Sequence, residues 1–455
     1  MFRLARSIMR PLHKQYQSAS GSQAFYMQHS SYHSLFINPP VHEVPELTTQ
    51  RITEIFAADI GQAKEYSAEG LKVTAERREA LMKLLPAADE QLPPRTMKDS
   101  FVTAIVPLKS QPEIRERYVN ADGRVRIGRL LEDMDVFAVF CCFKHILNPK
   151  SVGHKNPYSV VTALVDSIYI TNDMIKNSED VRLSGHVTYA GKSSMEVCIV
   201  VDQKDDQGVY QKRFDAVFLM VARDPMNRGS ARINPLLAET PEEQEFLKMG
   251  AARQKIRREQ EEENIFKKPP NEEERKIIHD RFIERMNQTS NAIPVNSKKM
   301  KDSVLKTVLI CQPQYRNRYN KIFGGFLMRM AYELAFTNTL IYGKKRPRIL
   351  NIDDIKFQLP VEIGSILRLR SHIGYVEGDF VHSVVIAEIV NPKTGEIRKS
   401  NEFHVSFLIP REAGEEPVPN LEFETYEEAI YYLDSRRHFK KMMEDFGDVV
   451  GNIGK

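Results

Sequence analysis

The pattern of apolar and polar positions predicts one long apolar helix and five strands, and it predicts this set twice. Each helix follows the first strand of its set, and four strands rich in Val, Ile, Tyr and Thr come after it. The first set has strands at 101–108, 160–170, 180–189, 194–202 and 213–222, with a helix at 128–147. The second has strands at 304–311, 349–357, 365–376, 380–390 and 402–409, with a helix from Gly325. This order is typical of an α+β fold in which a curved sheet wraps one helix.

Matching residues recur in the two sets, which indicates an internal duplication. The sequence Met-Lys-Asp-Ser occurs in both halves, and an asparagine lies eight residues before a helix glycine in both. A sheet wrapped around one helix leaves open edges, and pairing two copies would cover them. The repeated positions are Met97 and Met300, Asn120 and Asn317, Gly128 and Gly325, Asp166 and Asp354, and Phe214 and Phe403.

Residues 1–42 differ from the rest of the chain in charge. They contain no Asp or Glu, whereas four cations stand at three- and four-residue spacing near the start: Arg3, Arg6, Arg10 and Lys14. Because no long apolar stretch follows, the segment is typical of a mitochondrial presequence, with a disordered basic tail as the alternative. The four cations equal the formal net charge of +4, so the remainder is nearly neutral. A neutral remainder lacks the basic face that nucleic-acid binding requires.

The rest of the composition, 42% hydrophobic and 28% charged, is that of a globular protein, and no apolar run is long enough to predict a membrane span. None of the four cysteines forms a CxxC pair, so we expect reduced thiols and no metal. The scattered histidines, His404 among them, show no ligand spacing.

The chain between the two sets is strongly charged. Thr240, Pro241 and Glu243 form the start signal of a helix, and the basic stretch 253–258 within it has two interpretations. It is either a phosphate-binding patch or, as we favour, a solvated helical linker. We predict six segments: a presequence at 1–42, a helical N-terminal extension at 43–94, the first repeat at 95–225, the charged helical linker at 226–299, the second repeat at 300–412 and a C-terminal helical tail at 413–455.

The glycines that begin the two long helices are candidates for chemistry. Glycine permits a close approach to a ligand, and the first N–H groups of a helix have no partner within it. Such a helix start can bind an anion or a developing oxyanion, so we single out Gly128, Gly324 and Gly325. Close helix packing is a second role open to these glycines. Asp135 lies seven residues after Gly128, about two turns along the helix.

The duplicated helix-and-strand plan, with its asparagine before the glycine-led helix, resembles the double-hotdog acyl-coenzyme A thioesterases. The presequence and charged linker make it most similar to the mitochondrial nine-and-ten group, and the resemblance covers residues 95–412. It implies tandem hotdog domains paired within one chain, with an active site where they meet. The implied pair is Asp135 from the first half and Asn317 from the second.

The reciprocal pair would use Asn120, and there the match is incomplete. Tyr332 occupies the register of the carboxylate, and Glu333 follows one residue later, about a quarter of a turn round the helix. The second site is therefore altered or silent, and Glu333 is either catalytic or a structural remnant. The histidine that some relatives carry before the Gly-Gly pair is Phe323 here, which argues against a histidine-based dehydratase.

We expect direct hydrolysis of an acyl-coenzyme A without a covalent intermediate or a cofactor. Eight uncharged residues follow Asp135, so burial should raise its pKa and make it a general base, although a purely structural carboxylate is the alternative. Asn317 would orient the water or bind the thioester carbonyl, and the glycine N–H groups would stabilise the oxyanion. The acyl chain would lie beside Phe137, Val139 or Phe336.

Two other functions stay open at this point. One is a hotdog-fold acyl-coenzyme A hydratase, because the same fold can carry that reaction. The other is a non-catalytic acyl-coenzyme A-binding or assembly protein whose charged linker binds a partner. By analogy with other hotdog pairs, we expect a homo-oligomer. The presequence leads us to expect a location in the mitochondrial matrix, and the expected small-molecule partner is acyl-coenzyme A.

Overall fold

The structure, a computed structural model, describes most of the chain. It covers residues 47–60, 78–87, 91–152, 154–170, 175–287, 296–317, 321–353, 355–412 and 414–453. At 57–60 and 445–453 only the backbone is described. The predicted presequence at 1–42 lies outside the described residues, and so does Asp354.

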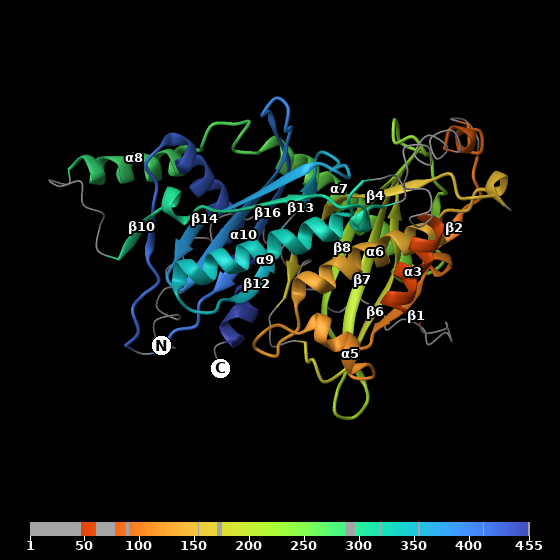
Figure 1. The fold of residues 1–455 in the computed structure, drawn as a ribbon, viewed down its shortest axis with the longest axis horizontal. Coiled ribbons are helices and arrows are strands. Elements are labelled where there is room, and N and C mark those ends of the chain that lie inside the picture. The colour runs from red at the N-terminus through yellow and green to blue at the C-terminus, as the bar shows by residue number, and fades with distance from the viewer. Residues whose placement is uncertain are drawn as a thin grey trace.

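In the first half, a curved antiparallel sheet packs around the long helix α6 (Ile127–His145) (Figure 1). The helix is buried on most sides, including at Asp133 and Asp135, because the sheet wraps it and a second helix lies against it. Its strands are β3 (Val102–Val106), β4 (Ser159–Val165), β5 (Ile168–Tyr169), β6 (Val181–Ala190), β7 (Ser194–Lys204) and β8 (Tyr210–Arg223).

The second half repeats this arrangement around α9 (Gly324–Gly343). Its strands are β11 (Leu305–Ile310), β12 (Arg348–Ile352), β13 (Ile355–Phe357), β14 (Ile366–Glu377), β15 (Phe380–Val390) and β16 (Ile397–Leu408). In each half, the second predicted strand is in fact two short strands. The chain leaves one strand pairing and enters another next to an aspartate, Asp166 in the first half and Asp353 in the second. Polar pairs, Asp166-Ser167 and Asp353-Asp354, interrupt the two apolar runs at this point, but the prediction treated each run as one strand.

A serine in each half makes the same hydrogen bond, which confirms the duplication. The hydroxyl oxygen of Ser100 accepts the backbone N–H of Val187 at 3.0 Å. The hydroxyl oxygen of Ser303 accepts that of Ile373, also at 3.0 Å. Both serines end the repeated Met-Lys-Asp-Ser motif, so the motif is a fixed link between the first strand of each half and the neighbouring strand.

Two of the predicted equivalences are wrong by one or two residues. The N–H of Asp166 donates to the carbonyl of Val217, and the N–H of Asp353 donates to that of His404. Asp353, and not Asp354, is therefore the counterpart of Asp166. Both ladders contain the same bulge, so the bulges do not change the relative numbering of the two halves. That numbering is set by the loop after each long helix, which runs from His145 to Ser159 in the first half and from Gly343 to Arg348 in the second, and the apolar pattern does not fix its length.

The phenylalanine pair is displaced as well. Arg213 and Ser400 are the extra residues of equivalent bulges in β8 and β16. Counting from these bulges, the counterpart of Phe214 is Asn401, and Phe403 lies two residues further along its strand.

The two halves form one continuous sheet of 13 strands, and their helices lie side by side. The sheets join where β4 pairs with β13, with Val165 opposite Ile355, and where β5 pairs with β12. The helices run antiparallel, since Gly128 lies against Tyr332 near one end and Gly325 lies against Asp135 near the other. This arrangement confirms the α+β class and the tandem hotdog fold.

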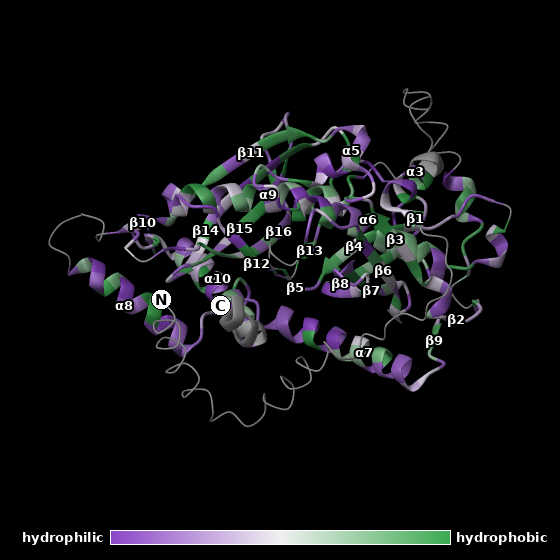
Figure 2. Ribbon diagram, turned by 90° about the horizontal axis from the view of Figure 1, so that it is seen from below, coloured by the Kyte–Doolittle hydropathy of each residue, from purple (hydrophilic) through white to green (hydrophobic). Residues whose placement is uncertain are grey.

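The predicted charged linker contains two helices, and the basic stretch lies on the first of them, which docks on the first half and is therefore not a solvated linker. Helix α7 (Pro241–Glu262) packs on β6, on the opposite side of the sheet from α6 (Figure 2). Arg253 and Arg257 bind the buried carboxylate of Glu196, and Arg257 also binds Asp166 at 2.6 Å. The phosphate-patch interpretation fails for the same reason, because these two cations are already paired.

Helix α10 (Tyr426–Ile453) covers the second half as α7 covers the first, and it lies within the C-terminal tail predicted at 413–455. At the N-terminal side, α3 (Thr49–Ile60) lies within the N-terminal extension predicted at 43–94 and packs on α6, with Phe56 edge-on to Phe140. No helix among the described residues is long and apolar enough to cross a membrane.

The remaining α-helices and strands are α5 (Pro112–Arg115), α8 (Glu272–Met286), β1 (Leu47–Thr48), β2 (Arg95–Thr96), β9 (Leu236–Leu237), β10 (Ser297–Lys299) and β17 (Asn420–Glu422).

Candidate active site

Asp135 lies at the contact between the two halves and is 1% exposed. One carboxylate oxygen accepts the backbone N–H of Gly325 on α9 at 2.7 Å, and the other accepts the hydroxyl of Thr162 on β4. Burial raises the pKa of Asp135 to about 6, although these two hydrogen bonds oppose the rise. A carboxylate with this pKa is ionised at neutral pH and is a stronger base than an exposed one.

The start of α9 brings two backbone donors near this carboxylate, the N–H groups of Gly324 and Gly325. The N–H of Gly325 is occupied by Asp135, so it does not serve as the oxyanion donor that the sequence suggested. The N–H of Gly324 has no hydrogen-bond partner among the described residues. A Cβ at position 324 would lie 3.4 Å from a carboxylate oxygen of Asp135, so the two groups are neighbours. The free N–H of Gly324 is therefore the donor best placed to meet an anion here.

Gly325 also has the packing role that the sequence left open. A Cβ there would lie 2.8 Å from the Cα of Glu132 and 2.9 Å from its carbonyl oxygen, both backbone atoms of α6. Only glycine allows the two helices to come this close. The close approach in turn brings the N–H of Gly325 within reach of Asp135.

Asn317 lies in the loop that leads into α9 and is 8% exposed. Its backbone N–H donates to the carbonyl of Lys321 at 2.6 Å, and its side-chain Oδ1 accepts the N–H of Lys321 at 3.1 Å. A backbone N–H can be accepted only by the amide oxygen, so the loop fixes which way the amide points. The other polar atom of the side chain, Nδ2, is a donor. This geometry favours a bond to a carbonyl oxygen over a role as a proton acceptor.

Asn120 has the same local geometry in the first half. Its Oδ1 accepts the N–H of Arg124 at 3.0 Å, and its backbone N–H donates to the carbonyl of Arg124 at 2.9 Å. The asparagine loop was therefore retained in both copies. The difference between the two sites lies in the opposing helix.

The reciprocal site has a tyrosine where the first site has a carboxylate. Tyr332 lies against Gly128, which is the counterpart of the contact between Asp135 and Gly325. Glu333 points elsewhere: it pairs with Arg126, and more loosely with Arg329 at 3.8 Å. Glu333 therefore does not take the position that Asp135 takes.

Thr162 was missed by the sequence analysis. Its hydroxyl donates to Asp135, and a bulge between Thr162 and Leu164 interrupts the ladder next to it. The equivalent bulge in the second half follows Ile349, which has no hydroxyl to donate. Threonine is common in apolar strands, so Thr162 by itself gives no sign of a role at the site. Only its comparison with Ile349 in the second half could have indicated that role.

Comparison with known proteins connects this geometry to a family. The chain is 40% identical to acyl-coenzyme A thioesterase 9, mitochondrial, of Bos taurus, over 81% of this chain and 83% of that protein. It is 39% identical to the Homo sapiens protein of the same name over the same shares, and 37% identical to acyl-coenzyme A thioesterase 10, mitochondrial, of Mus musculus, again over 81% and 83%. The chain belongs to the acyl-coenzyme A thioesterase 9 and 10 family.

No family model matches this thioesterase. Among solved structures, an acyl-CoA hydrolase from Staphylococcus aureus in complex with butyryl coenzyme A is 19% identical, with a TM-score of 0.31. The match covers 35% of this chain and 99% of the hydrolase.

Of the residues expected along the acyl chain, Phe137 and Val139 lie in the core of the thioesterase, and Phe336 is partly buried against it. Phe137 is fully buried, and its ring fills the space that the absent side chain of Gly185 leaves in β6. Val139 is also buried, and Phe336 packs edge-on against Phe407. Phe137 therefore belongs to the packing between helix and sheet in the first half.

Three histidines gather under α10, although their spacing in the sequence gave no sign of it. His382 and His404 on the sheet share a hydrogen bond at 3.0 Å, and His438 on α10 stacks on His404. Burial lowers the pKa of His382 to about 3. Burial also disfavours the charge of His438, but the carboxylates of Asp353 and Asp434 outweigh it and raise the pKa of His438 to about 9.

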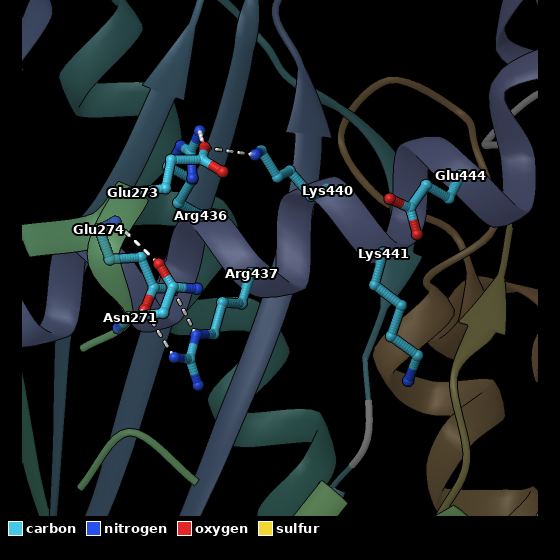
Figure 3. Close-up of a pocket in the computed structure, with 8 residues that line it drawn as sticks. All are labelled: Asn271, Glu273, Glu274, Arg436, Arg437, Lys440, Lys441 and Glu444. Atoms are coloured by element: carbon cyan, nitrogen blue, oxygen red, sulfur yellow. Dashed lines mark hydrogen bonds and ion pairs between the residues drawn. The ribbon is translucent and has the colours of Figure 1, made fainter. Parts of the chain in front are cut away.

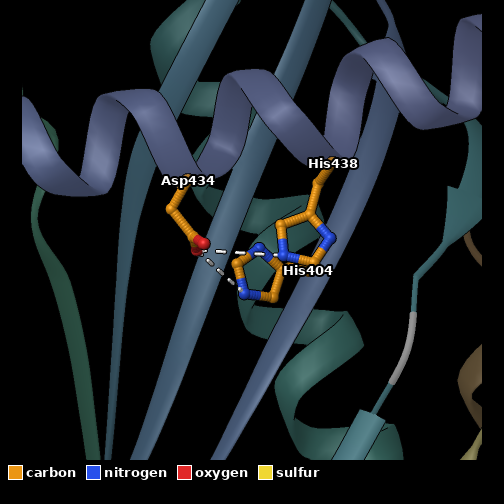
Figure 4. Close-up of side chains that lie close together, drawn as sticks. All are labelled: His404, Asp434 and His438. Atoms are coloured by element: carbon orange, nitrogen blue, oxygen red, sulfur yellow. Dashed lines mark ion pairs between the residues drawn. The ribbon is translucent and has the colours of Figure 1, made fainter. Parts of the chain in front are cut away.

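Within the described part of the thioesterase, His404, Asp434 and His438 are the group that could offer ligand atoms to a metal ion (Figure 4). The two imidazole rings lie 3.9 Å apart and are inclined by only 22°. A metal ligated by histidine lies near the plane of the ring, and two nearly parallel planes do not meet within bonding distance. These residues are better described as an ion-pair contact between α10 and the sheet, in which His438 binds the carboxylate of Asp353 at 2.6 Å.

A pocket of about 300 Å³ lies between α8 and α10 (Figure 3). Its charges pair with one another: Glu273 contacts Arg436 and Lys440, and Glu274 holds Arg437 through two bonds of 2.6 and 2.7 Å. These contacts hold α8, the second helix of the predicted linker, against α10, which covers the second half.

Proposed function

We propose that this thioesterase hydrolyses fatty acyl-coenzyme A at one site, with Asp135 as the general base and Asn317 and Gly324 as donors. The observation that carries the proposal is the buried carboxylate of Asp135 at the start of a helix from the other half. Its base strength comes from burial, and its orientation comes from Gly325 and Thr162. Membership of the family supports the reaction.

In the proposed reaction Asp135 takes a proton from a water molecule, whose oxygen attacks the thioester carbon. The carbonyl oxygen becomes an oxyanion, which accepts the Gly324 N–H and the Nδ2 hydrogens of Asn317. The carbon–sulfur bond then breaks, and the departing thiolate of coenzyme A recovers the proton from Asp135. A donor at the oxyanion typically contributes about 3–4 kcal/mol to the transition state. No bond forms between enzyme and substrate.

We infer that the reciprocal site is silent. Asn120 keeps its loop, but Tyr332 faces Gly128, and a neutral phenol cannot act as the base there. Burial raises the pKa of Tyr332, which makes its ionised form still rarer. Glu333 is held by arginines and is only partly buried.

Free thiol release from a panel of acyl-coenzyme A substrates tests these roles. The variants are Asp135→Asn, Asn317→Ala, Asn120→Ala and Glu333→Gln, with Asp133→Asn as the matched control. Asp133 is also buried on α6, and burial raises its pKa to about 6 as well. We expect Asp135→Asn and Asn317→Ala to lose at least about 100-fold in kcat/KM and the other three to keep their rate.

Other outcomes would change the assignment of the active site or of the function. Loss of rate in Asn120→Ala and Glu333→Gln alone would place the reaction in the other site. Hydration of an enoyl substrate without thiol release would support the hydratase. Tight acyl-coenzyme A binding without turnover would support a binding or assembly protein.

We further propose that the protein works as a homo-oligomer in the mitochondrial matrix. The acid-free segment 1–42 and the mitochondrial relatives support the location. Fusion of residues 1–42 to a fluorescent protein tests it: the fusion should enter the matrix, and a variant with its four cations changed to Gln should stay outside. Import of both fusions alike, or of neither, would contradict the role of this segment.

A further inference from the structure

Glu132 on α6 and Arg329 on α9 form an ion pair between the two repeats. The Nε of Arg329 donates to a carboxylate oxygen of Glu132 at 2.9 Å, and the two side chains are only 15% and 14% exposed. Glu132 lies four residues after Gly128. Arg329 lies four residues after Gly325, so the two charged residues are counterparts under the duplication. Equivalent positions that meet each other mark the local two-fold axis between the repeats.

The two positions at this axis carry opposite charges, which identical domains could not do. In a two-fold pair of identical domains one position meets its own copy, and two glutamates or two arginines would repel each other in a largely buried place. The contacts beside the axis are still symmetric. A Cβ at Gly325 would meet Glu132. Likewise, a Cβ at Gly128 would meet Arg329. The ion pair therefore depends on a difference between the two repeats.

This ion pair lies beside the hydrogen bond that orients the candidate base. On α6, Glu132 precedes Asp135 by three residues. On α9, Arg329 follows Gly325 by four, so within each helix the two residues are about one turn apart. The ion pair and the bond from the Gly325 N–H to Asp135 therefore connect the same two helices at neighbouring turns. A contact that holds the helices together here also holds that bond.

The other partners of the two charged residues do not make this connection. Arg129 also donates to Glu132, at 2.5 Å, but both residues belong to α6. Arg329 lies 3.8 Å from Glu333, and both belong to α9. A further ion pair joins Arg126, the N-cap of α6, to Glu333, but it lies at the reciprocal site. Arg329 is therefore the partner of Glu132 that ties α6 to α9 beside the base.

We propose that Arg329 is a positioning residue for the hydrolysis. Through Glu132 it holds the start of α9 against α6, so that the N–H of Gly325 keeps its bond to Asp135. This inference rests on the proposed function, in which Asp135 is the base. Without the ion pair the first turns of α9 are free to move away from α6, and the carboxylate loses the donor that fixes its orientation.

The pH profile gives a readout that a purely structural role would not change. Burial raises the pKa of Asp135, and hydrogen bonds from Thr162 on β4 and Gly325 on α9 oppose the rise. The charge of Glu132 on α6 adds to the rise. Removing Arg329 loosens the bond from Gly325 and leaves the charge of Glu132 less compensated, and both changes raise the pKa of the base. The acid limb of the profile should therefore move to higher pH.

Thiol release from acyl-coenzyme A, measured with the full chain across the acid limb, tests the role. Arg329→Met keeps the length of the side chain and removes its charge, whereas Arg329→Lys keeps the charge. We expect Arg329→Met to lose about tenfold or more in kcat with KM little changed, because a displaced catalytic group slows the chemical step. Its acid limb should lie at higher pH than that of wild type. Arg329→Lys should recover most of the rate.

Double variants show whether Arg329 acts through Glu132. In Glu132→Gln the partner charge is already gone, so adding Arg329→Met should cost little more. In Glu333→Gln the looser contact of 3.8 Å is gone, and adding Arg329→Met should still cost the full loss. Glu132→Gln also keeps the shape of the side chain, so it carries the test if Arg329→Met does not fold, as judged by circular dichroism. Additive losses with Glu132→Gln, or an equal fall in rate at every pH, would overturn the proposal.

Asp135→Asn separates this inference from the proposed function. If Asp135→Asn keeps its thiol release, the base lies elsewhere, and the proposed function fails together with this inference. If Asp135→Asn loses its rate while Arg329→Met keeps the wild-type rate and acid limb, the base assignment stands and the positioning role is overturned.

Discussion

The carboxylate of Asp135 on α6 accepts the N–H of Gly325 on α9 at 2.7 Å, so the candidate base belongs to one repeat and its anchor belongs to the other. The bond requires the close helix approach that glycine permits at position 325. Neither repeat could form this site alone. The duplication therefore allows one chain to complete one site and lose the reciprocal one.

The pKa of Asp135 predicts the acid limb of the pH profile. The base must be ionised to accept a proton, and its pKa is about 6. We expect kcat/KM to be level above pH 7 and to fall about tenfold per unit well below pH 6. Initial rates in buffers from pH 4.5 to 8.5 measure this, and an acid limb near pH 4, where an exposed carboxylate titrates, would contradict the burial argument.

Removing the hydroxyl of Thr162 should shift that limb. The hydroxyl donates to the charged carboxylate and so lowers the pKa of Asp135. Thr162→Val removes the bond, so the acid limb should move to higher pH, and the rate at pH 6 should fall more than the rate at pH 8. Thr162→Ser keeps the hydroxyl and should restore the wild-type profile, while equal losses at every pH would indicate a steric effect.

Gly325→Ala should be more damaging than Gly128→Ala. A Cβ at position 325 meets backbone atoms of α6 at 2.8 and 2.9 Å, whereas one at position 128 meets side-chain atoms of Arg329 and Tyr332 at 3.2 Å. Side chains can move aside more readily than a helix backbone. We expect Gly325→Ala to lower the free energy of unfolding by about 1–3 kcal/mol and to impair catalysis as well.

Urea titrations followed by circular dichroism compare the two variants, with thiol release measured in parallel. Gly128→Ala should lie within about 1 kcal/mol of wild type, since it removes neither a paired group nor core volume. Equal destabilisation by both changes would mean that the helices adjust together and that the contact at Glu132 is not special.

The charged contact of His438 should make stability depend on pH. Its pKa is about 9 in the folded protein against an ordinary 6.5, so the contact contributes fully below pH 6.5 and is lost as the pH rises through 9. A shift of this size corresponds to about 3 kcal/mol. His438→Leu should therefore destabilise most at pH 6, and the gap to wild type should narrow by pH 9.5.

Urea titrations at four pH values between 6 and 9.5 check this expectation. The other groups at the contact are Asp353, Asp434 and Lys441, with His382 and His404 on the sheet. The two sheet histidines have lowered pKa values and stay neutral in this range. A pH-independent gap between variant and wild type would show that His438 acts through packing alone.

The sequence indicated most of the fold because the apolar pattern and the repeated motifs are local signals. The Met-Lys-Asp-Ser repeat and the paired asparagines marked two copies of one domain, and the apolar run after Asp135 correctly predicted its burial. The strand equivalences failed because the loop after each long helix differs in length between the halves, and the apolar pattern does not fix that length. Arg257 was missed because its partner, Asp166, lies 91 residues away in the chain.

By itself, the sequence determined that this protein has two copies of one α+β domain, each built around a glycine-led helix, and it placed one carboxylate on the buried face. Only the tertiary structure decided which N–H group Asp135 uses, that Thr162 supports it, and that Tyr332 replaces the second carboxylate against Gly128. The reason is physical: periodicity reports which side of an element is buried. The partner of a side chain depends on how two distant elements pack, and at this site the packing depends on one missing Cβ at Gly325.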